Sequence, residues 1–231
     1  MSVDPQAVAQ TFRDQGIVIL PGFFDPELMK KVAAELDGVV AADPNRPWGS
    51  GPEYARLRET KVQVWSGDNL PSVKIAFSDP RLHAITEAIL GANYRLRGCG
   101  IFSTPYQGGQ GWHQDSRDRA PGHYELNRII FPKNLQPEQG GLVYVPGSFR
   151  GPDLPPGGNH ESLPGEKVAL PTAGTLVLMH TLCYHRVQIN QTHTPRTQCN
   201  SRAQPLTTPE DICAYPIFRT GPWNFKTGKP E

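Results

Sequence analysis

Two residues in the middle of the chain have types and a spacing that could bind a metal ion. His113 and Asp115 are two positions apart, and residues i and i+2 of a strand point to the same side. An imidazole nitrogen and a carboxylate oxygen on one side of a strand are suitable ligands for a divalent ion such as Fe(II). The spacing alone is common, so a surface histidine beside a solvated aspartate is the competing interpretation.

A second group of candidate residues follows an apolar stretch at 175–179. His180 and His185 come after this stretch, and Arg196 follows eleven residues later. One of the two histidines would complete a set of two histidines and one carboxylate, which leaves one face of an octahedron open for a co-substrate and O2. Because they are five positions apart, the two would face opposite ways on an extended strand. An arginine such as Arg196 has the forked group that holds a carboxylate.

The elements that must position these residues fall into two parts. Apolar spacing and Asp–Pro starts predict helices early in the chain, and short apolar stretches between Gly/Pro-rich turns predict strands later. The expected helices are 4–14, one from 25 onward and 79–91, and the expected strands are 17–20, 61–65, 94–103, 125–131, 142–145, 175–179, 184–189 and 211–217. This order predicts a mainly β fold with outer helices, either an antiparallel barrel or a double-sheet jelly roll.

Composition excludes several other classes of protein. Of the 231 residues, 23 are Gly and 24 are Pro, which argues against a helical bundle or coiled coil. The net charge of +1 gives no reason to expect a nucleic-acid partner. The apolar runs are shorter than the roughly 20 residues of a membrane helix. The start of the chain has no secretory signal and no pair of its 4 cysteines is spaced as C-x-x-C, so we expect a cytoplasmic protein with reduced thiols.

The chain resembles the phytanoyl-CoA dioxygenase family of Fe(II)/2-oxoglutarate oxygenases in four segments that occur in the family's order. These segments are Phe12–Phe24, Gly111–Asp115, Gln139–Phe149 and Gly174–Arg196. The resemblance implies a double-stranded β-helix (jelly roll, cupin-like) over 1–231 as a single domain, with a helical part at about 1–91 and a β core at about 92–217.

The same resemblance implies the roles of five residues. His113, Asp115 and His185 would bind Fe(II), so the resemblance selects His185 over His180. Arg196 would bind the far carboxylate of 2-oxoglutarate, and Gln114 is similar to a residue that helps to hold this co-substrate. The implied reaction is the oxidation of a C–H bond, normally hydroxylation, with O2 consumed and succinate and CO2 released. Desaturation, ring formation and epimerisation are alternatives within the same cofactor class.

Substrate contacts are predicted from position alone. Arg128 points into the barrel if its strand has one of the two parities, and there it would meet an anionic group. Tyr106 and Trp112 are candidates for the pocket lining, with ordinary packing as the alternative. The Pro/Gly-rich segment Gly147–Lys167, with Pro44–Pro52, is expected to border the pocket mouth.

The substrate is expected to be a small molecule, because the barrel is short and the sequence contains no second domain that would present a macromolecule. Two other function classes are kept. One is a non-oxygenase cupin-like metalloprotein with Zn(II) or another ion, which would not need Arg196. The other is a binding protein with a vestigial site. The sequence does not determine the oligomeric state.

Overall fold

The computed structural model describes residues 3–45, 62–116, 118–152 and 160–209, and the backbone of two short strands at 223–224 and 229–230. Its α-helices are α1 (Pro5–Gln15), α2 (Pro26–Ala42), α3 (Pro71–Phe77) and α4 (Pro80–Leu90). Three of these helices begin with an Asp–Pro pair, and the carboxylates of Asp4, Asp25 and Asp79 each accept a hydrogen bond from the first turn. Proline loses no hydrogen bond at the first helical position, because an N–H there has no partner inside the helix. The residues at each Asp–Pro pair therefore determine where these helices begin. None of the described helices combines the length and the apolar character needed to cross a bilayer.

Helix α3 was not predicted, because it is stabilised from outside its own sequence. Its N-cap residue, Leu70, has no capping side chain. The free N–H groups of Ser72 and Val73 donate instead to the carboxylate of Glu35 on α2. Seven residues are also too few to show a helical period.

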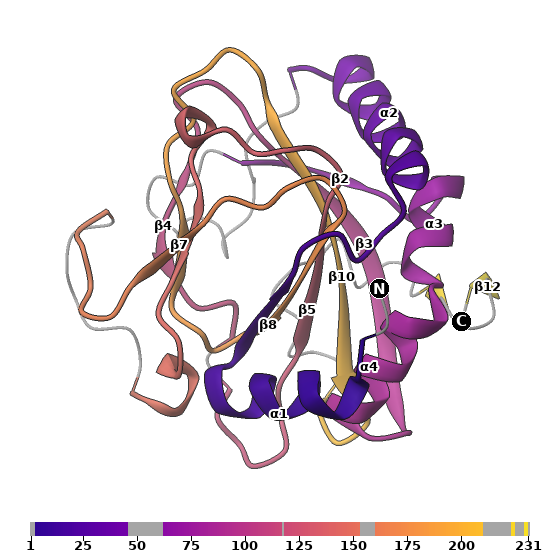
Figure 1. The fold of residues 1–231 in the computed structure, drawn as a ribbon, viewed down its shortest axis with the longest axis vertical. Coiled ribbons are helices and arrows are strands. Elements are labelled where there is room, and N and C mark those ends of the chain that lie inside the picture. The colour runs from indigo at the N-terminus through magenta and orange to yellow at the C-terminus, as the bar shows by residue number, and fades with distance from the viewer. Residues whose placement is uncertain are drawn as a thin grey trace.

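The strands form two antiparallel sheets (Figure 1). The major sheet has the order β1-β8-β5-β10-β3-β2 and the minor sheet the order β4-β9-β6-β7. Their bounds are β1 (Ile17–Leu20), β2 (Gln63–Ser66), β3 (Tyr94–Thr104), β4 (Gln110–His113), β5 (Leu126–Phe131), β6 (Leu142–Tyr144), β7 (Lys167–Ala169), β8 (Thr175–His180), β9 (His185–Val187) and β10 (Arg196–Pro205). A separate pair, β11 (Trp223–Asn224) and β12 (Lys229–Pro230), lies outside both sheets. Figure 1 shows α2, α3 and α4 on one side of the major sheet and β4 and β7 on the other side. The predicted jelly roll with outer helices is therefore confirmed.

The part of the chain before residue 92 also contributes the two predicted strands at 17–20 and 61–65 to the fold. Strand β1 pairs with β8 and strand β2 pairs with β3, so both early strands are edges of the major sheet. The chain thus begins its sheet before the third predicted helix. The strand expected at 211–217 lies outside the described residues.

Strand β10 is the element that is hardest to predict from the sequence. It pairs with β3 on one side and β5 on the other, yet its sequence, RTQCNSRAQP, has almost no apolar residues. Hydrophobic pattern therefore gives no signal there. The strand is nevertheless buried, because polar side chains on its inner face bond to one another and to the neighbouring strands.

Strand β5 shows how the two faces of the major sheet differ. Leu126 and Ile130 pack in the cluster that faces the helices. Ile129 and Phe131 pack against Leu142 of the minor sheet, inside the barrel. Both faces are covered, so apolar residues occur at both parities and alternation cannot reveal which face is inside.

The described ends of segment 147–167 lie against other elements and do not stand free. Gly147 N–H donates to Gln15 O at the end of α1 at 2.8 Å, and the guanidinium of Arg150 donates to carbonyls of the same turn. Tyr184 O–H donates to Pro152 O at 2.6 Å. The described ends of this segment are thus hydrogen-bonded to the end of α1 and to Tyr184 beside the minor sheet. Residues 153–159, like 46–61, lie outside the described residues, so the expected lid stays a prediction.

Gly16 is the tightest point where α1 meets the sheet, and we predict that it cannot be replaced without loss of stability. Its φ is +70°, and an added Cβ would overlap Phe149 and lie 2.6 Å from Cys183 Sγ. Gly16→Ala should lower the free energy of unfolding by about 1–2 kcal/mol for the left-handed backbone and by roughly a further 1–3 kcal/mol for overpacking. Gly22→Ala is the matched control, because its φ is +63° and nothing lies within 4 Å. Equal losses in urea unfolding would contradict the packing argument.

Candidate metal centre

His113 and His185 are brought together by the register of the minor sheet. Strand β4 ends at His113 and strand β9 begins at His185, and the two residues are direct partners across the strand pair. Their ring centroids are 4.0 Å apart. Direct partners share one face of a sheet, so the pairing itself aims both rings into the barrel.

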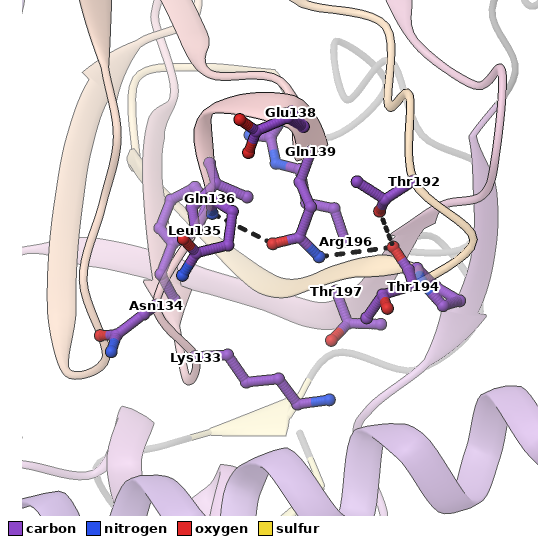
Figure 2. A pocket seen from close by; sticks show the side chains of 12 residues that line it. Lys133, Asn134, Leu135, Gln136, Glu138, Gln139, Thr192, Thr194, Arg196 and Thr197 are labelled. Atoms are coloured by element: carbon purple, nitrogen blue, oxygen red, sulfur yellow. Dashed lines mark hydrogen bonds between the residues drawn. The ribbon is translucent and has the colours of Figure 1, made fainter.

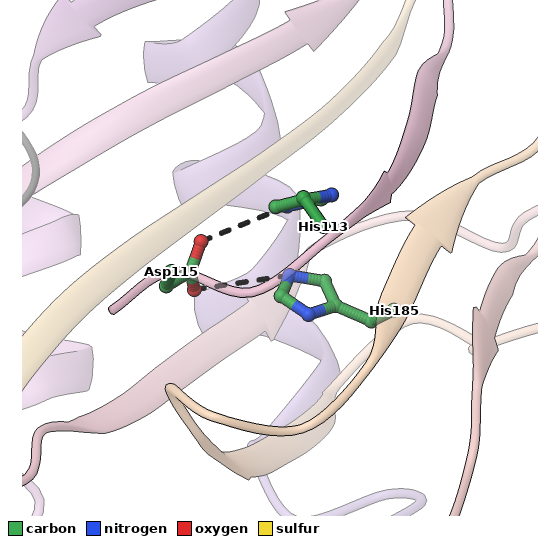
Figure 3. A group of neighbouring side chains, drawn as sticks. All are labelled: His113, Asp115 and His185. Atoms are coloured by element: carbon green, nitrogen blue, oxygen red, sulfur yellow. Dashed lines mark ion pairs between the residues drawn. The ribbon is translucent and has the colours of Figure 1, made fainter. Parts of the chain in front are cut away.

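Asp115 completes the cluster from a turn. Strand β4 has ended before Asp115, so the expected strand parity is not what aligns it with His113. Its N–H donates instead to Thr181 O at 2.7 Å. This backbone hydrogen bond places the carboxylate between the two imidazoles. Its Oδ1 lies 3.6 Å from His113 Nε2 and its Oδ2 lies 3.7 Å from His185 Nε2 (Figure 3). One ligand atom from each of the three buried residues lies within 4.8 Å of the others.

Both histidines present the same nitrogen to the cluster. His113 Nδ1 lies 2.8 Å from Gly111 O, and His185 Nδ1 lies 2.9 Å from Cys183 O. A carbonyl can only accept, so each Nδ1 carries a proton, and in a neutral ring the electron pair is then on Nε2. Burial, and then the neighbouring His185, lower the pKa of His113 to about 3. The ring is therefore neutral and available as a ligand at neutral pH.

The Asp115 carboxylate stays ionised although it is buried. Burial alone would raise its pKa, but Arg202 and the two imidazoles hold the pKa well below its usual range. Arg202 Nη2 lies 2.9 Å from Oδ2, and Asn127 Nδ2 donates to the same oxygen at 2.7 Å. The centre thus offers two imidazole nitrogens and one anionic oxygen, a donor set that fits a divalent transition metal.

His180 lies outside this cluster. Its ring stacks on Tyr124 and lies against Phe149, with centroids 4.8 Å away in both cases. Its Nδ1 accepts a hydrogen bond from Leu182 N–H at 3.1 Å. The ring therefore stabilises the turn between β8 and β9. His180 does not belong to the group formed by His113, Asp115 and His185.

Arg196 occupies the first position of β10 and is 3% exposed. Its Nη2 donates to Gln198 Oε1 at 3.3 Å, while Nε and Nη1 have no hydrogen-bond partner among the described residues. Burial lowers the pKa of the guanidinium to about 10, so it remains charged at neutral pH. A buried cation with two unpaired donors is complementary to a carboxylate.

A cavity of about 390 Å³ opens beside Arg196 at the end of β5 (Figure 2). Phe131, Lys133, Gln139 and Thr194 are among its lining residues. The Gln139 amide spans part of the wall, because it donates to Thr194 O and accepts from Gln136 N–H. The described lining residues do not include the three residues of the metal cluster.

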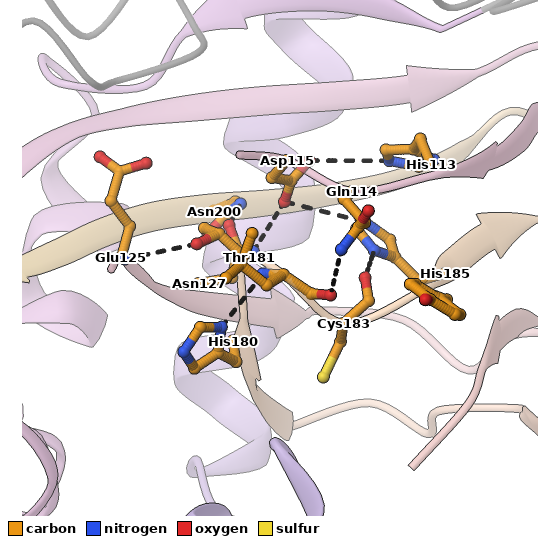
Figure 4. A network of polar contacts seen from close by, with 12 residues as sticks. His113, Gln114, Asp115, Glu125, Asn127, His180, Thr181, Cys183, His185 and Asn200 are labelled. Carbon is orange, nitrogen blue, oxygen red and sulfur yellow. Dashed lines mark hydrogen bonds and ion pairs between the residues drawn. The ribbon is translucent and has the colours of Figure 1, made fainter. Parts of the chain in front are cut away.

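Gln114 lies between the two ends of the cluster and is half-buried. Its Nε2 donates to Leu182 O at 2.8 Å (Figure 4). This contact ties the turn after β4 to the turn before β9.

Arg128 does not point into the barrel, which corrects the predicted parity. Its side chain is fully buried on the helical face, where it lies over the ring of Phe77 and donates to Ser201 O and Oγ. The inward residue is its neighbour Asn127. Because both faces of β5 are covered, the sequence alone favoured neither orientation.

Trp112 also points away from the predicted pocket. It precedes His113 on β4 and therefore faces the outside of the minor sheet, where its indole N–H donates to Glu161 O at 2.6 Å. Tyr106 lies at the surface, 45% exposed and stacked on His193. A substrate contact by Tyr106 stays a prediction.

Three polar residues behind Asp115 were missed by the sequence analysis. Asn127, Arg202 and Glu125 are fully buried and connected to one another and to the cluster. No motif marks them. The available signal was the unusual polarity of 196–205, which has meaning only when that segment is recognised as a central strand.

Comparison with known proteins agrees with this geometry. The sequence model of the phytanoyl-CoA dioxygenase family matches residues 12–198. A curated relative, the dioxygenase hkm4 of Aspergillus hancockii, is 26% identical over 215 residues, which cover 83% of this chain and 68% of that protein.

Solved structures share the fold at low sequence identity. The epimerase SnoN in complex with Fe3+, alpha-ketoglutarate and nogalamycin RO is 22% identical, with a TM-score of 0.70 over 99% of this chain and 96% of SnoN. The alpha-ketoglutarate-dependent carbocyclase SnoK from nogalamycin biosynthesis is 17% identical, with a TM-score of 0.68 over 97% and 92% of the two chains.

The stacked position of His180 predicts a loss of stability in acid. Burial, with a smaller effect of Arg119, lowers the pKa of His180 to about 4, whereas an unfolded histidine titrates near 6.5. Between these values the unfolded chain binds a proton that the folded chain does not, so falling pH favours unfolding by about 1.4 kcal/mol per pH unit. Urea unfolding of the metal-free protein from pH 7 to 4.5 should show this slope. His180→Phe should lack this contribution, and an unchanged slope would contradict the assignment.

Proposed function

The chain belongs to the phytanoyl-CoA dioxygenase family, and from this premise we propose that His113, Asp115 and His185 hold Fe(II) while a C–H bond of a small molecule is oxidised. The chain is an Fe(II)/2-oxoglutarate-dependent dioxygenase. The observation that carries the residue assignment is the buried cluster of two Nε2 atoms and one carboxylate within 4.8 Å.

The chain's own residues prepare the centre before any ion binds. Carbonyls fix the tautomer of both histidines, and the Asp115 N–H bond to Thr181 O fixes the carboxylate. Fe(II) with 2-oxoglutarate, when bound, supplies the oxidising power from O2 and yields succinate and CO2. The two histidines and Asp115 would leave one face of the metal open for these molecules.

Arg196 is proposed to bind the far carboxylate of 2-oxoglutarate. Within the described part of the chain, its buried Nε and Nη1 have no hydrogen-bond partner, and such donors cost free energy unless an anion accepts their hydrogen bonds. Arg196, Gln198, Asn200 and Arg202 alternate along β10, so they share the face that leads toward Asp115. Gln114 is proposed to contact the same co-substrate, as the resemblance to the family implies.

The proposed outcome is hydroxylation of a small molecule. The size of the substrate is supported by SnoN, whose structure contains nogalamycin RO. Epimerisation and ring formation form the second candidate, because SnoN is an epimerase and SnoK a carbocyclase. A cytoplasmic location is proposed from Cys99, Cys183 and Cys199, which are free thiols.

Succinate formation from 2-oxoglutarate with Fe(II) and ascorbate, screened over candidate metabolites, tests the function. Mass spectrometry of the consumed metabolite then separates the outcomes. Hydroxylation adds one oxygen atom, ring formation or desaturation removes two hydrogens, and epimerisation leaves the mass unchanged. A protein that binds Zn(II) and forms no succinate with any metabolite would favour a non-oxygenase metalloprotein.

The metal assignment predicts which histidine is essential. His185→Ala should lower the affinity for Fe(II) by roughly a hundredfold or more, because loss of a direct ligand costs at least as much as loss of an outer partner. Calorimetric titration with Fe(II) under argon measures this. His180→Phe is the control and should bind Fe(II) as the wild type does. The reverse pattern, with iron lost only in His180→Phe, would overturn the assignment.

The co-substrate assignment predicts a selective defect in Arg196→Met. Breaking one side of a buried arginine–carboxylate pair costs about 3–5 kcal/mol, so the KM for 2-oxoglutarate should rise by about a hundredfold or more. Fe(II) affinity in the absence of 2-oxoglutarate should stay unchanged, which shows that the centre is intact. An unaltered KM would rule out this role for Arg196.

A further inference from the structure

A row of four polar side chains crosses one end of the minor sheet. At this end β4 ends at His113, β9 begins at His185, β6 ends at Tyr144 and β7 begins at Lys167. Each of these residues is the direct partner of the next one across the sheet. Direct partners share one face of a sheet, so Tyr144 and Lys167 continue the line of the two proposed histidine ligands.

The packing of the neighbouring row shows that this face is the inside of the barrel. Two residues along the strands, the partners on β9, β6 and β7 are Val187, Leu142 and Ala169. Leu142 belongs to the apolar cluster between the two sheets, and both Ala169 and Tyr144 pack against that cluster. Because residues two apart on a strand share a face, Lys167 lies on the same side as Ala169. The inner face is therefore apolar in this row and polar in the row of the proposed ligands.

Tyr144 and Lys167 are both accessible to a ligand. The side chain of Tyr144 is half-buried and that of Lys167 is exposed. In the described part of the chain, no hydrogen bond or ion pair engages the Tyr144 hydroxyl or the Lys167 ammonium. A phenol can donate one hydrogen bond and an ammonium three, so this part of the row offers donors and one positive charge.

The acidic neighbour of Lys167 in the sequence does not neutralise it. The carboxylate of Glu166 accepts a hydrogen bond from Leu163 N–H at 2.9 Å and lies 3.4 Å from Arg186 Nη2. The guanidinium of Arg186 lies over the ring of Trp112, which faces the outside of the minor sheet. Glu166 is thus engaged on the outer face, whereas Lys167 is on the inner face.

The far carboxylate of 2-oxoglutarate does not account for this row. That carboxylate is assigned to Arg196, which belongs to β10 of the major sheet. Tyr144 and Lys167 lie on the other side of His185 from His113, on the two strands of the minor sheet that supply no proposed ligand. Lys167 also ends the segment that the sequence predicts at the pocket mouth. A molecule that enters there would meet Lys167 first, Tyr144 next and the metal last.

Resting on the proposed function, we propose that Tyr144 and Lys167 bind the substrate of this centre, and that the substrate carries a carboxylate or phosphate group. Neighbouring strands are about 4.8 Å apart, so Lys167 is two strand spacings, roughly 10 Å, from His185 along the row. The anionic group is therefore separated from the oxidised C–H bond by a similar distance. Lys167 attracts the anion as a flexible point charge, and Tyr144 donates to an oxygen atom nearer the metal.

The first test compares anions with their neutral counterparts. The Fe(II)-loaded wild type is given 2-oxoglutarate and a panel of aliphatic and aromatic carboxylic acids and phosphate monoesters, each beside its primary amide or free alcohol. The anions should stimulate succinate formation at concentrations at least about tenfold lower than their neutral counterparts, because contacts between charged groups are the stronger ones. The two arms distinguish a carboxylate from a phosphate. Equal stimulation by neutral compounds, or no stimulation by any anion, would overturn the inference.

The second test measures binding without turnover. The protein is loaded with Co(II) and 2-oxoglutarate and titrated calorimetrically with the most effective anion of the panel. Lys167→Glu should weaken its binding at least about tenfold, and Lys167→Arg should bind it nearly as the wild type does, because the charge is kept. Tyr144→Phe should weaken binding by roughly three- to tenfold through the loss of one hydrogen bond. Salt should weaken binding in the wild type and not in Lys167→Glu.

Lys31→Glu is the matched control for the charge reversal. Lys31 is an exposed lysine of α2, which lies on the other side of the major sheet from β7 (Figure 1), so this variant should bind the anion as the wild type does. Wild-type affinity in Lys167→Glu, or an equal loss in Lys31→Glu, would contradict the assignment of Lys167. Weaker binding of 2-oxoglutarate in Tyr144→Phe, with the anion unaffected, would place the phenol on the co-substrate instead.

Failure of the proposed function gives a different result from failure of this inference. The visible absorption of the Co(II)-loaded wild type should change when 2-oxoglutarate is added, whatever the substrate is. If it does not change, the proposed function fails. If it changes but anions have no advantage over neutral compounds, only the inference about Tyr144 and Lys167 fails.

Discussion

A carboxylate that is to hold a metal inside a barrel must remain ionised where water cannot solvate it. Burial opposes this, and in the present chain Arg202, Asn127 and the two imidazoles overcome it at Asp115. The arginine in turn requires Glu125. The polar interior of β10 and β5 follows from this one requirement, because each buried charge must find its partner within the same layer of the sheet.

The proposed metal centre lies at the junction of the two sheets, and each sheet contributes different residues. The minor sheet places His113 opposite His185 through its register. The major sheet supplies Asn127 and Arg202 from adjacent strands, again as direct partners. The turn after β8 connects them, because Thr181 O holds Asp115 and the backbone of Thr181 pairs with Glu125. A small shift between the sheets would therefore move the ligands and their support together.

The two arginines on the inner face of β10, Arg196 and Arg202, differ in their partners. Arg202 forms ion pairs with Asp115 and Glu125 near the metal end. Six residues away, Nε and Nη1 of Arg196 have no hydrogen-bond partner among the described residues. Alternation places both in the barrel, and Gln198 and Asn200 lie between them. Arg128 belongs to the opposite face of the same layer, which explains why a residue of the same type and burial has no part in the site.

The sequence by itself determined much of the local structure and pointed to the residues that we propose as ligands. Asp–Pro starts mark three helices, apolar runs mark β1, β5 and β8, and His113, Asp115, His185 and Arg196 are recognisable from types, spacing and resemblance. These signals depend on residues that are close together in the chain, so they can be recognised in one sequence without a structure. Helix α3, the inner face of β5 and the whole of β10 were decided by tertiary structure. Glu35 caps α3 from another helix, both faces of β5 are covered, and β10 is buried through hydrogen bonds and ion pairs whose partners are distant in sequence. Hydrophobic pattern reports burial only where burial is apolar. The support of the metal centre is buried and polar, so only the folded chain reveals it.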